Sequence, residues 1–199
     1  MYVFGISKKY NRIGFHIKYG SYKYMHTHSD FWEFMLTVSG NYTHNINGET
    51  VKLKPRTLCI IRPSDCHSII AEKEKGCSHI NISIKEDYLE QIMSIFSLDI
   101  YEKLLSSHNP AILLSPTEAD EIIREANYIL SKTKKRNEDS VLTLVFPILK
   151  ILINDATGED KKASNYGKLV SDIISLISDK DNLSLTLKEL IAATGYSYH

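Results

Sequence analysis

Two histidines and a glutamate stand close together near the start of the chain. His26 and His28 are separated by one residue, and Glu33 follows five positions after His28. Side chains two residues apart on a strand project from the same face, so the two imidazoles are predicted to lie side by side. After a short bend, a second strand would return Glu33 to that face, and His67 is the candidate for a fourth ligand. Imidazole and carboxylate together suit a divalent ion such as Zn, Ni, Mn or Fe.

This spacing resembles the first signature of the cupin β-barrels. All five positions of the signature are present, at Gly20, His26, His28, Glu33 and Gly40. Five, one, four and six residues separate them, as in the signature. The second cupin signature appears in altered form between residues 57 and 71, where Pro63 and His67 are kept while Thr57 and Asp65 replace glycines. The resemblance therefore covers the first half of the chain more closely than the second.

Short apolar and β-branched runs, separated by Gly, Pro and Asn-Gly, fill the chain from Tyr2 to about Ile84. Runs of this kind predict strands, and many short strands at regular spacing predict a closed sandwich or barrel. Asn47-Gly48 lies between two such runs, which predicts a hairpin with a type I′ turn. The pattern indicates that the metal-type residues lie on the strands of one barrel.

The apolar period becomes helical after Lys85. Helices are predicted over residues 85–96, from Pro116 with Ser115 as its N-cap, and over residues 138–153. The last of these helices is apolar on more than one side, which predicts a second packing partner, and another copy of the chain would serve. The fold class is therefore α+β.

Composition places the chain among ordinary globular proteins. The 199 residues carry 24 basic and 24 acidic side chains, which is no argument for a nucleic-acid or membrane surface over the whole chain. The N-terminus lacks a secretory signal, no run is apolar enough to span a bilayer, and the three cysteines form no CxxC pair. We expect a cytoplasmic protein with reduced thiols and no membrane partner.

The end of the chain has a different character. Residues 154–165 are small, polar and charged, and are interpreted as a linker. Beyond them, a short helix capped by Thr186 and ended by Gly195 predicts the first helix and turn of a helix-turn-helix. Ser197 would cap the next helix and, with Tyr198, contact DNA. The simpler alternative is one more packed helix and turn.

Residues 166–199 resemble the start of the DNA-binding domain of AraC/XylS-type regulators, and the whole order of parts is most similar to the chitobiose-operon regulators within that family. The resemblance implies a cupin-type barrel (a double-stranded β-helix) over residues 1–84, a helical dimerisation region over 85–153, the linker, and a helix-turn-helix domain truncated early, over 166–199. It implies a homodimer and no enzymatic activity. Promoter DNA would be bound only by the full-length protein.

A family of this kind senses a small molecule in its barrel, and a sugar is the expected effector. Aromatic faces and polar groups suit sugars, and the effector-binding residues are predicted to be Tyr24, Thr37, Tyr42, His44 and Arg62. Arg62 would pair with an anionic group.

The sequence leaves open two interpretations of the site and three of the function. The His and Glu side chains hold a metal, or they line the barrel and hydrogen-bond the effector directly. The chain is a regulator, or it is a metal-dependent cupin enzyme such as a dioxygenase or sugar isomerase. A dimerisation module without a ligand is the third function, and it would leave the His and Glu side chains without a role. The effector, the operator and the sign of regulation are not predicted.

Overall fold

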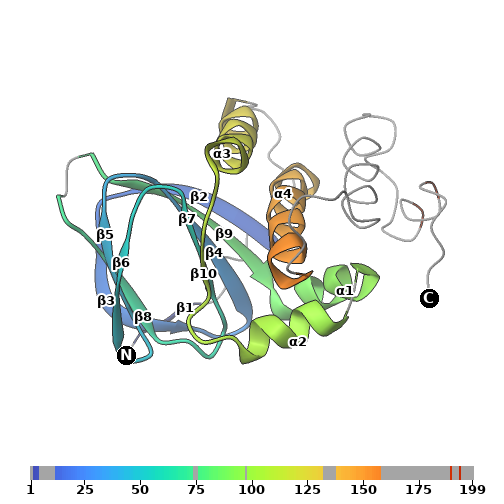
Figure 1. Cartoon of the computed structure of the whole chain (residues 1–199), viewed down its shortest axis with the longest axis horizontal. Helices are drawn as coiled ribbons and strands as arrows, with labels where there is room; N and C mark the ends of the chain where they lie inside the picture. The colour runs from blue at the N-terminus through green and yellow to red at the C-terminus, as the bar shows by residue number, and fades with distance from the viewer. Residues whose placement is uncertain are drawn as a thin grey trace.

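The computed structural model describes residues 2–4, 12–73, 76–96, 98–131 and 138–157, together with residues 189 and 193. Over these residues the strands gather into a barrel and the helices lie beside it (Figure 1). The strands are β1 (Tyr2–Phe4), β2 (Ile13–Tyr19), β3 (Tyr22–His28), β4 (Phe31–Ser39), β5 (Tyr42–Ile46), β6 (Glu49–Leu53), β7 (Thr57–Ile61), β8 (His67–Ala71), β9 (Ser78–Lys85) and β10 (Ala111–Leu113). The helices are α1 (Glu86–Phe96), α2 (Leu98–Ser106), α3 (Pro116–Ser131) and α4 (Glu138–Thr157).

The strands form two five-stranded sheets that face each other. One sheet has the order β1-β3-β8-β5-β6 and the other has the order β10-β7-β4-β9-β2. Strands that are consecutive in the sequence often lie in different sheets, as β3 and β4 do, so the chain winds back and forth between the two layers. This arrangement confirms the predicted α+β fold with a cupin-type barrel.

Strand β4 has two buried faces. Trp32, Phe34 and Leu36 belong to the apolar core shared by the second sheet and the helices. The alternate residues Glu33 and Met35 are buried on the opposite face, toward the other sheet. Because side chains alternate along a strand, the same segment closes the barrel inside and supports the helices outside. Trp32 thus faces away from the Glu33 side.

The barrel interior holds a smaller apolar cluster, which is separate from the core under the helices. Its buried members are Met35, Tyr42, Ile46, Leu53, Cys59, Ile61, Ile69, Ala71 and Cys77. Several polar side chains are also buried among the described residues, including the predicted metal ligands. The interior is thus apolar in part and polar in part, which is the composition of a small-molecule site.

Two glycine-containing turns explain the register of the barrel. Asn47 and Gly48 have φ angles of 51° and 84°, and Ile46 pairs with Glu49, so the predicted type I′ hairpin is confirmed. Gly40 has a φ of 72°, and a Cβ there would collide with the side chain of Cys77 and lie 3.0 Å from its Cα. The cupin signature glycine is therefore required by the close approach of two chain segments.

The helices follow the predicted pattern with two differences. Helix α3 begins at Pro116 as expected, and Ser115 and Glu118 bond each other's backbone amides in a capping box. Helix α4 continues to Thr157 rather than ending at Ile153, because polar residues alone do not terminate a helix. The apolar sides of α4 contact β2, α2 and α3 of the same chain. Helix α2 and strand β10 were not predicted.

No helix within the described part of the chain is long and apolar enough to cross a membrane. Strand β9 ends at Lys85 and α1 begins at the next residue, where the predicted barrel meets the predicted helical region. The first residues of the predicted linker, 154–157, belong to α4. Most of the predicted linker and almost all of residues 166–199 lie outside the described residues.

Candidate functional site

The three predicted histidine ligands meet inside the barrel. His26 and His28 lie on β3, and His67 is the first residue of β8 and the cross-strand partner of His26. One ring nitrogen from each of the three lies within 4.8 Å of the others, and all three side chains are buried. The two adjacent strands thus bring together residues that are far apart in the sequence, and three imidazoles in this arrangement can hold a metal ion.

The distances within this cluster suit one shared ion. The Nε2 atoms of His28 and His67 are 3.1 Å apart. Two nitrogens that bind a tetrahedral ion at about 2.0–2.1 Å each lie roughly 3.3 Å from each other. An Oε2 atom of Glu33 is 3.8 Å from His28 Nε2, so the carboxylate reaches the same place from β4. The donor set of three imidazoles and one carboxylate therefore fits a divalent metal.

The far nitrogens of two rings have partners that orient them. His26 Nδ1 lies 3.0 Å from the carbonyl oxygen of Tyr24, to which it donates, and this leaves its other nitrogen for a ligand. His67 Nδ1 lies 3.1 Å from His44 Nε2, so His44 supports His67 from behind. Ligand histidines in metalloproteins are commonly held in this way through the nitrogen that does not bind the metal. His28 Nδ1 is buried and has no hydrogen-bond partner in the described part of the chain.

Burial keeps the imidazoles neutral. It lowers the pKa of His28 to about 3, with the neighbouring His26 as the second cause. Burial also lowers the pKa values of His26 and His67, and lowers that of His44 to about 4. Neutral imidazole is the form that binds metals and that accepts hydrogen bonds. The same burial raises the pKa of Glu33 to about 7.

A second polar group lines the interior on β9. His79 and Asn81 are 2% and 4% exposed, and His79 Nδ1 is 3.2 Å from the Tyr42 hydroxyl. Asn81 Oδ1 is buried and has no partner among the described atoms. On the neighbouring strand β2, Lys18 is the cross-strand partner of His79. His79 is not among the predicted site residues, although the alternation His79-x-Asn81 indicates a polar strand face.

The predicted effector residues occupy different environments. Thr37, Tyr42 and His44 are buried in the barrel. The Thr37 hydroxyl donates to the carbonyl of Lys54 and accepts from the amide of Thr57, so it ties β4 to the start of β7. Tyr24 is 65% exposed. The β3–β8 register is irregular between Tyr22 and His26, which breaks the alternation that would have put Tyr24 beside His26.

Arg62 is engaged in an ion pair outside the histidine cluster. Its Nε lies 3.0 Å from Oδ2 of Asp65, which is 3% exposed, and its Nη1 donates to the carbonyls of Leu105 and Ser107 at 2.7 and 2.6 Å. These carbonyls stand at the C-terminal end of α2. A cation at this position caps the helix and fixes it to the barrel.

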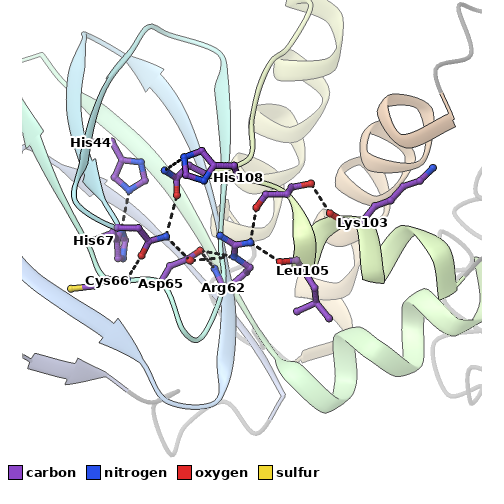
Figure 2. A network of polar contacts seen from close by, with 11 residues as sticks. His44, Arg62, Asp65, Cys66, His67, Lys103, Leu105 and His108 are labelled. Atoms are coloured by element: carbon purple, nitrogen blue, oxygen red, sulfur yellow. Dashed lines mark hydrogen bonds and ion pairs between the residues drawn. The ribbon is translucent and has the colours of Figure 1, made fainter.

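His67 is joined to this helix end through its chain neighbour Cys66 and a series of hydrogen bonds, as Figure 2 shows. Cys66, next to His67, donates its amide to Asn47 Oδ1 at 3.0 Å. Asn47 Nδ2 then donates to Asp65 Oδ1 at 2.8 Å, and Asp65 pairs with Arg62. The residues that surround the candidate metal position are therefore linked to α2 by a continuous polar network.

This network ends at a cavity of about 830 Å³ outside the barrel. The cavity lies between α2, β10 and the end of α4, and Ser107, Leu104 and Asp155 are among the residues that line it. It does not include the histidine cluster. The predicted DNA contacts Ser197 and Tyr198 lie outside the described residues.

Several solved structures are similar to this chain. A cupin protein from Bacteroides fragilis aligns over 39% of this chain and 70% of that one, with 20% identity and a TM-score of 0.36. ToxT from Vibrio cholerae O395, bound to (E)-4-(8-methylnaphthalen-1-yl)but-3-enoic acid, aligns over 94% of this chain and 73% of ToxT, with 9% identity and a TM-score of 0.49. KdgF from a Halomonas species aligns over 39% of this chain and 75% of that one, with 16% identity and a TM-score of 0.33.

None of the curated proteins matches the sequence. The family model of the AraC-like ligand-binding domain matches residues 13–143. That range starts at β2, includes all the strands that carry the buried histidines, and ends within α4. Because this match covers most of the chain, and the matched residues form a barrel with a polar interior, the protein belongs to the family of AraC-like ligand-binding domains.

Proposed function

We propose that this chain is the effector-sensing part of a ligand-responsive transcription regulator of the AraC type, and that it is not an enzyme. The observation that carries the proposal is the family match over residues 13–143, which contain a closed barrel with a buried polar interior. Polar side chains are expensive to bury without partners, so their concentration here supports a bound ligand. The effector would lie among them, inside the barrel.

The predicted metal ligands are part of this proposal. His26, His28, His67 and Glu33 would hold one divalent ion of Zn, Ni, Mn or Fe, and such an ion supplies a positive charge and open coordination positions for oxygen donors. The ring partners of His26 and His67 described above support this assignment. In the alternative, the same neutral imidazoles hydrogen-bond the effector directly.

The route from the effector to the rest of the regulator is proposed to pass through α2. An effector that displaces His67 would move its neighbour Cys66, whose amide is bonded to Asn47, and would act through Asp65 and Arg62 on the end of α2. Helix α2 contacts α4, the last helix before the predicted linker. A ligand shifts such an equilibrium by the difference in its affinity for the two arrangements.

The proposal also covers the effector, the assembly and the DNA contacts. The effector is a small molecule of the sugar class, bound with the help of Tyr24, Thr37, Tyr42 and His44, whereas Arg62 is occupied by Asp65 and the end of α2. The regulator acts in the cytoplasm as a homodimer formed through its helical region, and the full-length protein binds promoter DNA through a helix-turn-helix domain that begins near residue 166. Its operator contacts would include Ser197 and Tyr198. Within the AraC type, we propose that the protein is similar to the chitobiose-operon regulators.

One observation favours a metal-dependent enzyme as the second candidate. Three imidazoles and a carboxylate around one point also make a catalytic metal site with open positions. An enzyme would turn its ligand over, whereas a sensor would release it unchanged. Incubation of the metal-loaded protein with a bound compound, followed by mass spectrometry of that compound, distinguishes the two.

Ligand binding is tested by thermal unfolding of the protein with a panel of mono- and disaccharides, since a ligand of the native state raises the melting temperature. We expect one class of compound to raise it by several degrees in the wild-type protein and not in His67→Gln. His108→Gln is the matched control, because His108 is exposed and pairs with Glu49 outside the barrel. A panel without any effect, or the same effect in His67→Gln, argues against the proposed site.

A further inference from the structure

The inner face of the second sheet carries an ordered set of polar side chains. Strands β4, β9 and β2 are paired in register, so their residues form rows across the sheet. Thr37, His79 and Lys18 make one row, and Met35, Asn81 and His16 make the next. Cross-strand neighbours on one face have Cβ atoms about 4.5–5.5 Å apart. Lys18 and His79 are therefore neighbours at one end of this face.

Glu33 marks the other end of the same face. It stands in the row of Ser83, two rows away from the row of Lys18. Four residues along a strand span about 13 Å. The interior consequently has two ends of different chemistry, with Glu33 and the histidine cluster at one and a lysine beside a buried histidine at the other.

Lys18 is positioned to act on the barrel interior. Its residue is exposed, although its cross-strand partner His79 is buried. Burial is the main cause that lowers the pKa of His79 to about 4, and the charge of Lys18 is the second cause. The same charge lowers the pKa of His16 and opposes the rise that burial causes in the pKa of Glu33. The same charge also lowers the pKa values of His26, His28 and His67, so it acts across the interior as well as on its neighbour His79. Lys18 therefore contributes positive charge to the interior.

Hydrogen-bonding capacity is left over beside this lysine. Asn81 Oδ1 is buried without a partner in the described part of the chain, and it lies one row from Lys18. The Tyr42 hydroxyl supports the ring of His79 from β5, across the barrel. An unpaired buried acceptor costs free energy, and a hydroxyl donor on a ligand would remove that cost.

We propose that the effector of this barrel is a hydroxylated anion, whose carboxylate or phosphate lies against Lys18 and His79 and whose hydroxyl donates to Asn81. The inference rests on the proposed sensor function and specifies the chemistry of its ligand. Arg62, the cation that the sequence had suggested for an anionic ligand, is already held by Asp65 and by α2 carbonyls. Lys18 is the cation that takes its place in the site.

The test compares compounds that differ in one charged group. Affinities of the 199-residue protein for D-glucose, D-glucuronate and D-glucose 6-phosphate are measured by titration calorimetry at constant ionic strength. The two acids distinguish a carboxylate from a phosphate. We expect at least one acid to bind at least tenfold more tightly than glucose, and Lys18→Met to weaken that acid at least tenfold. Lys52→Met is the matched control, because Lys52 is an exposed lysine that pairs with Glu72 on the barrel exterior.

The outcomes separate this inference from the function on which it rests. If glucose binds as tightly as both acids, if neither acid binds, or if Lys18→Met binds the acid as the wild type does, the anion proposal is overturned. A neutral sugar that binds through His67 would leave the sensor function in place. Asn81→Leu gives a second readout: it should weaken the preferred acid severalfold, and an unchanged affinity contradicts the role of Asn81.

Discussion

His28 and His67 bring their Nε2 atoms to within 3.1 Å of each other inside the barrel, although 39 residues separate them in the sequence. Two nitrogen atoms that face each other so closely share one hydrogen or one ion. Because burial lowers the pKa of both rings, both are neutral near pH 7 and each can present a lone pair at this point. The relationship therefore suits a metal ion or a ligand donor between the two rings.

Metal content tests the first of these possibilities. Protein purified without a histidine tag should contain close to one divalent ion per chain, and the double variant His26→Ala, His28→Ala should contain almost none, because it lacks two of the four proposed ligands. Elemental analysis by mass spectrometry measures both. Equal and substoichiometric metal in the two proteins would rule out the metal site and leave direct hydrogen bonding to the effector.

The link between Arg62 and the barrel predicts a large effect on stability. Arg62→Met removes the partner of buried Asp65 and two bonds to the end of α2, and should lower the free energy of unfolding by about 3–5 kcal/mol. Urea denaturation measures it. Lys52→Met, which breaks the exposed pair with Glu72, should cost less than about 1 kcal/mol. Similar values for the two variants would show that the Arg62 pair does not hold α2 to the barrel.

Two glycines allow a comparison of backbone strain with steric clash. Gly40 and Gly48 both have positive φ angles, but only Gly40 has another segment, at Cys77, where a Cβ would lie. Gly48→Ala should cost about 1 kcal/mol, from strain alone, and Gly40→Ala about 2 kcal/mol more. Chemical denaturation of both variants gives the difference. Equal losses would mean that the β4–β5 turn is not closed against Cys77.

Acid stability should depend on His79. Its folded-state pKa is lowered from 6.5 to about 4, mainly by burial and then by Lys18, so the unfolded chain takes up the proton first as the pH falls. The neutral His79 ring therefore contributes about 3 kcal/mol to the free energy of unfolding. This contribution is fully present above pH 6.5 and is lost as the pH falls toward 4. The groups that face this ring are Tyr42, Lys18 and Thr37.

Unfolding free energies of the wild type and His79→Gln between pH 7 and pH 4, with a chelator present, measure this contribution. The variant should lose less stability than the wild type over that range, because its amide does not titrate. His108→Gln, at an exposed histidine, should follow the wild type. Parallel curves for the wild type and His79→Gln would indicate that His79 has the same pKa in the folded and the unfolded protein, which contradicts the lowering by burial.

Local sequence patterns predict much of the barrel. Alternation along residues 31–39 predicted which side chains of β4 face inward, and the Asn47-Gly48 pair predicted the hairpin that the φ angles confirm. The spacing of His26, His28 and Glu33 predicted that these side chains lie on one face. Each of these features depends on residues close to one another in the chain, where backbone geometry alone determines the outcome.

The features that were missed depend on tertiary contacts. Strand β10 has three residues and exists through its pairing with β7, which no local period encodes. Tyr24 leaves the predicted face because of a register irregularity in the β3–β8 pair. The position of Arg62 is set by α2, an element that the sequence had not indicated, and the polar face of Lys18, His79 and Asn81 emerges only when β2 pairs with β9.

The central claim is that the polar interior of the barrel controls a DNA-binding regulator. The most direct test uses the full-length protein and a compound that raises its melting temperature, and measures the dissociation constant for its own upstream DNA by fluorescence anisotropy with and without that compound. We predict that the compound changes the DNA affinity at least fivefold in the wild type, and that His67→Gln keeps the compound-free DNA affinity but loses the change. An equal change in His67→Gln, or no change in the wild type, would contradict the account.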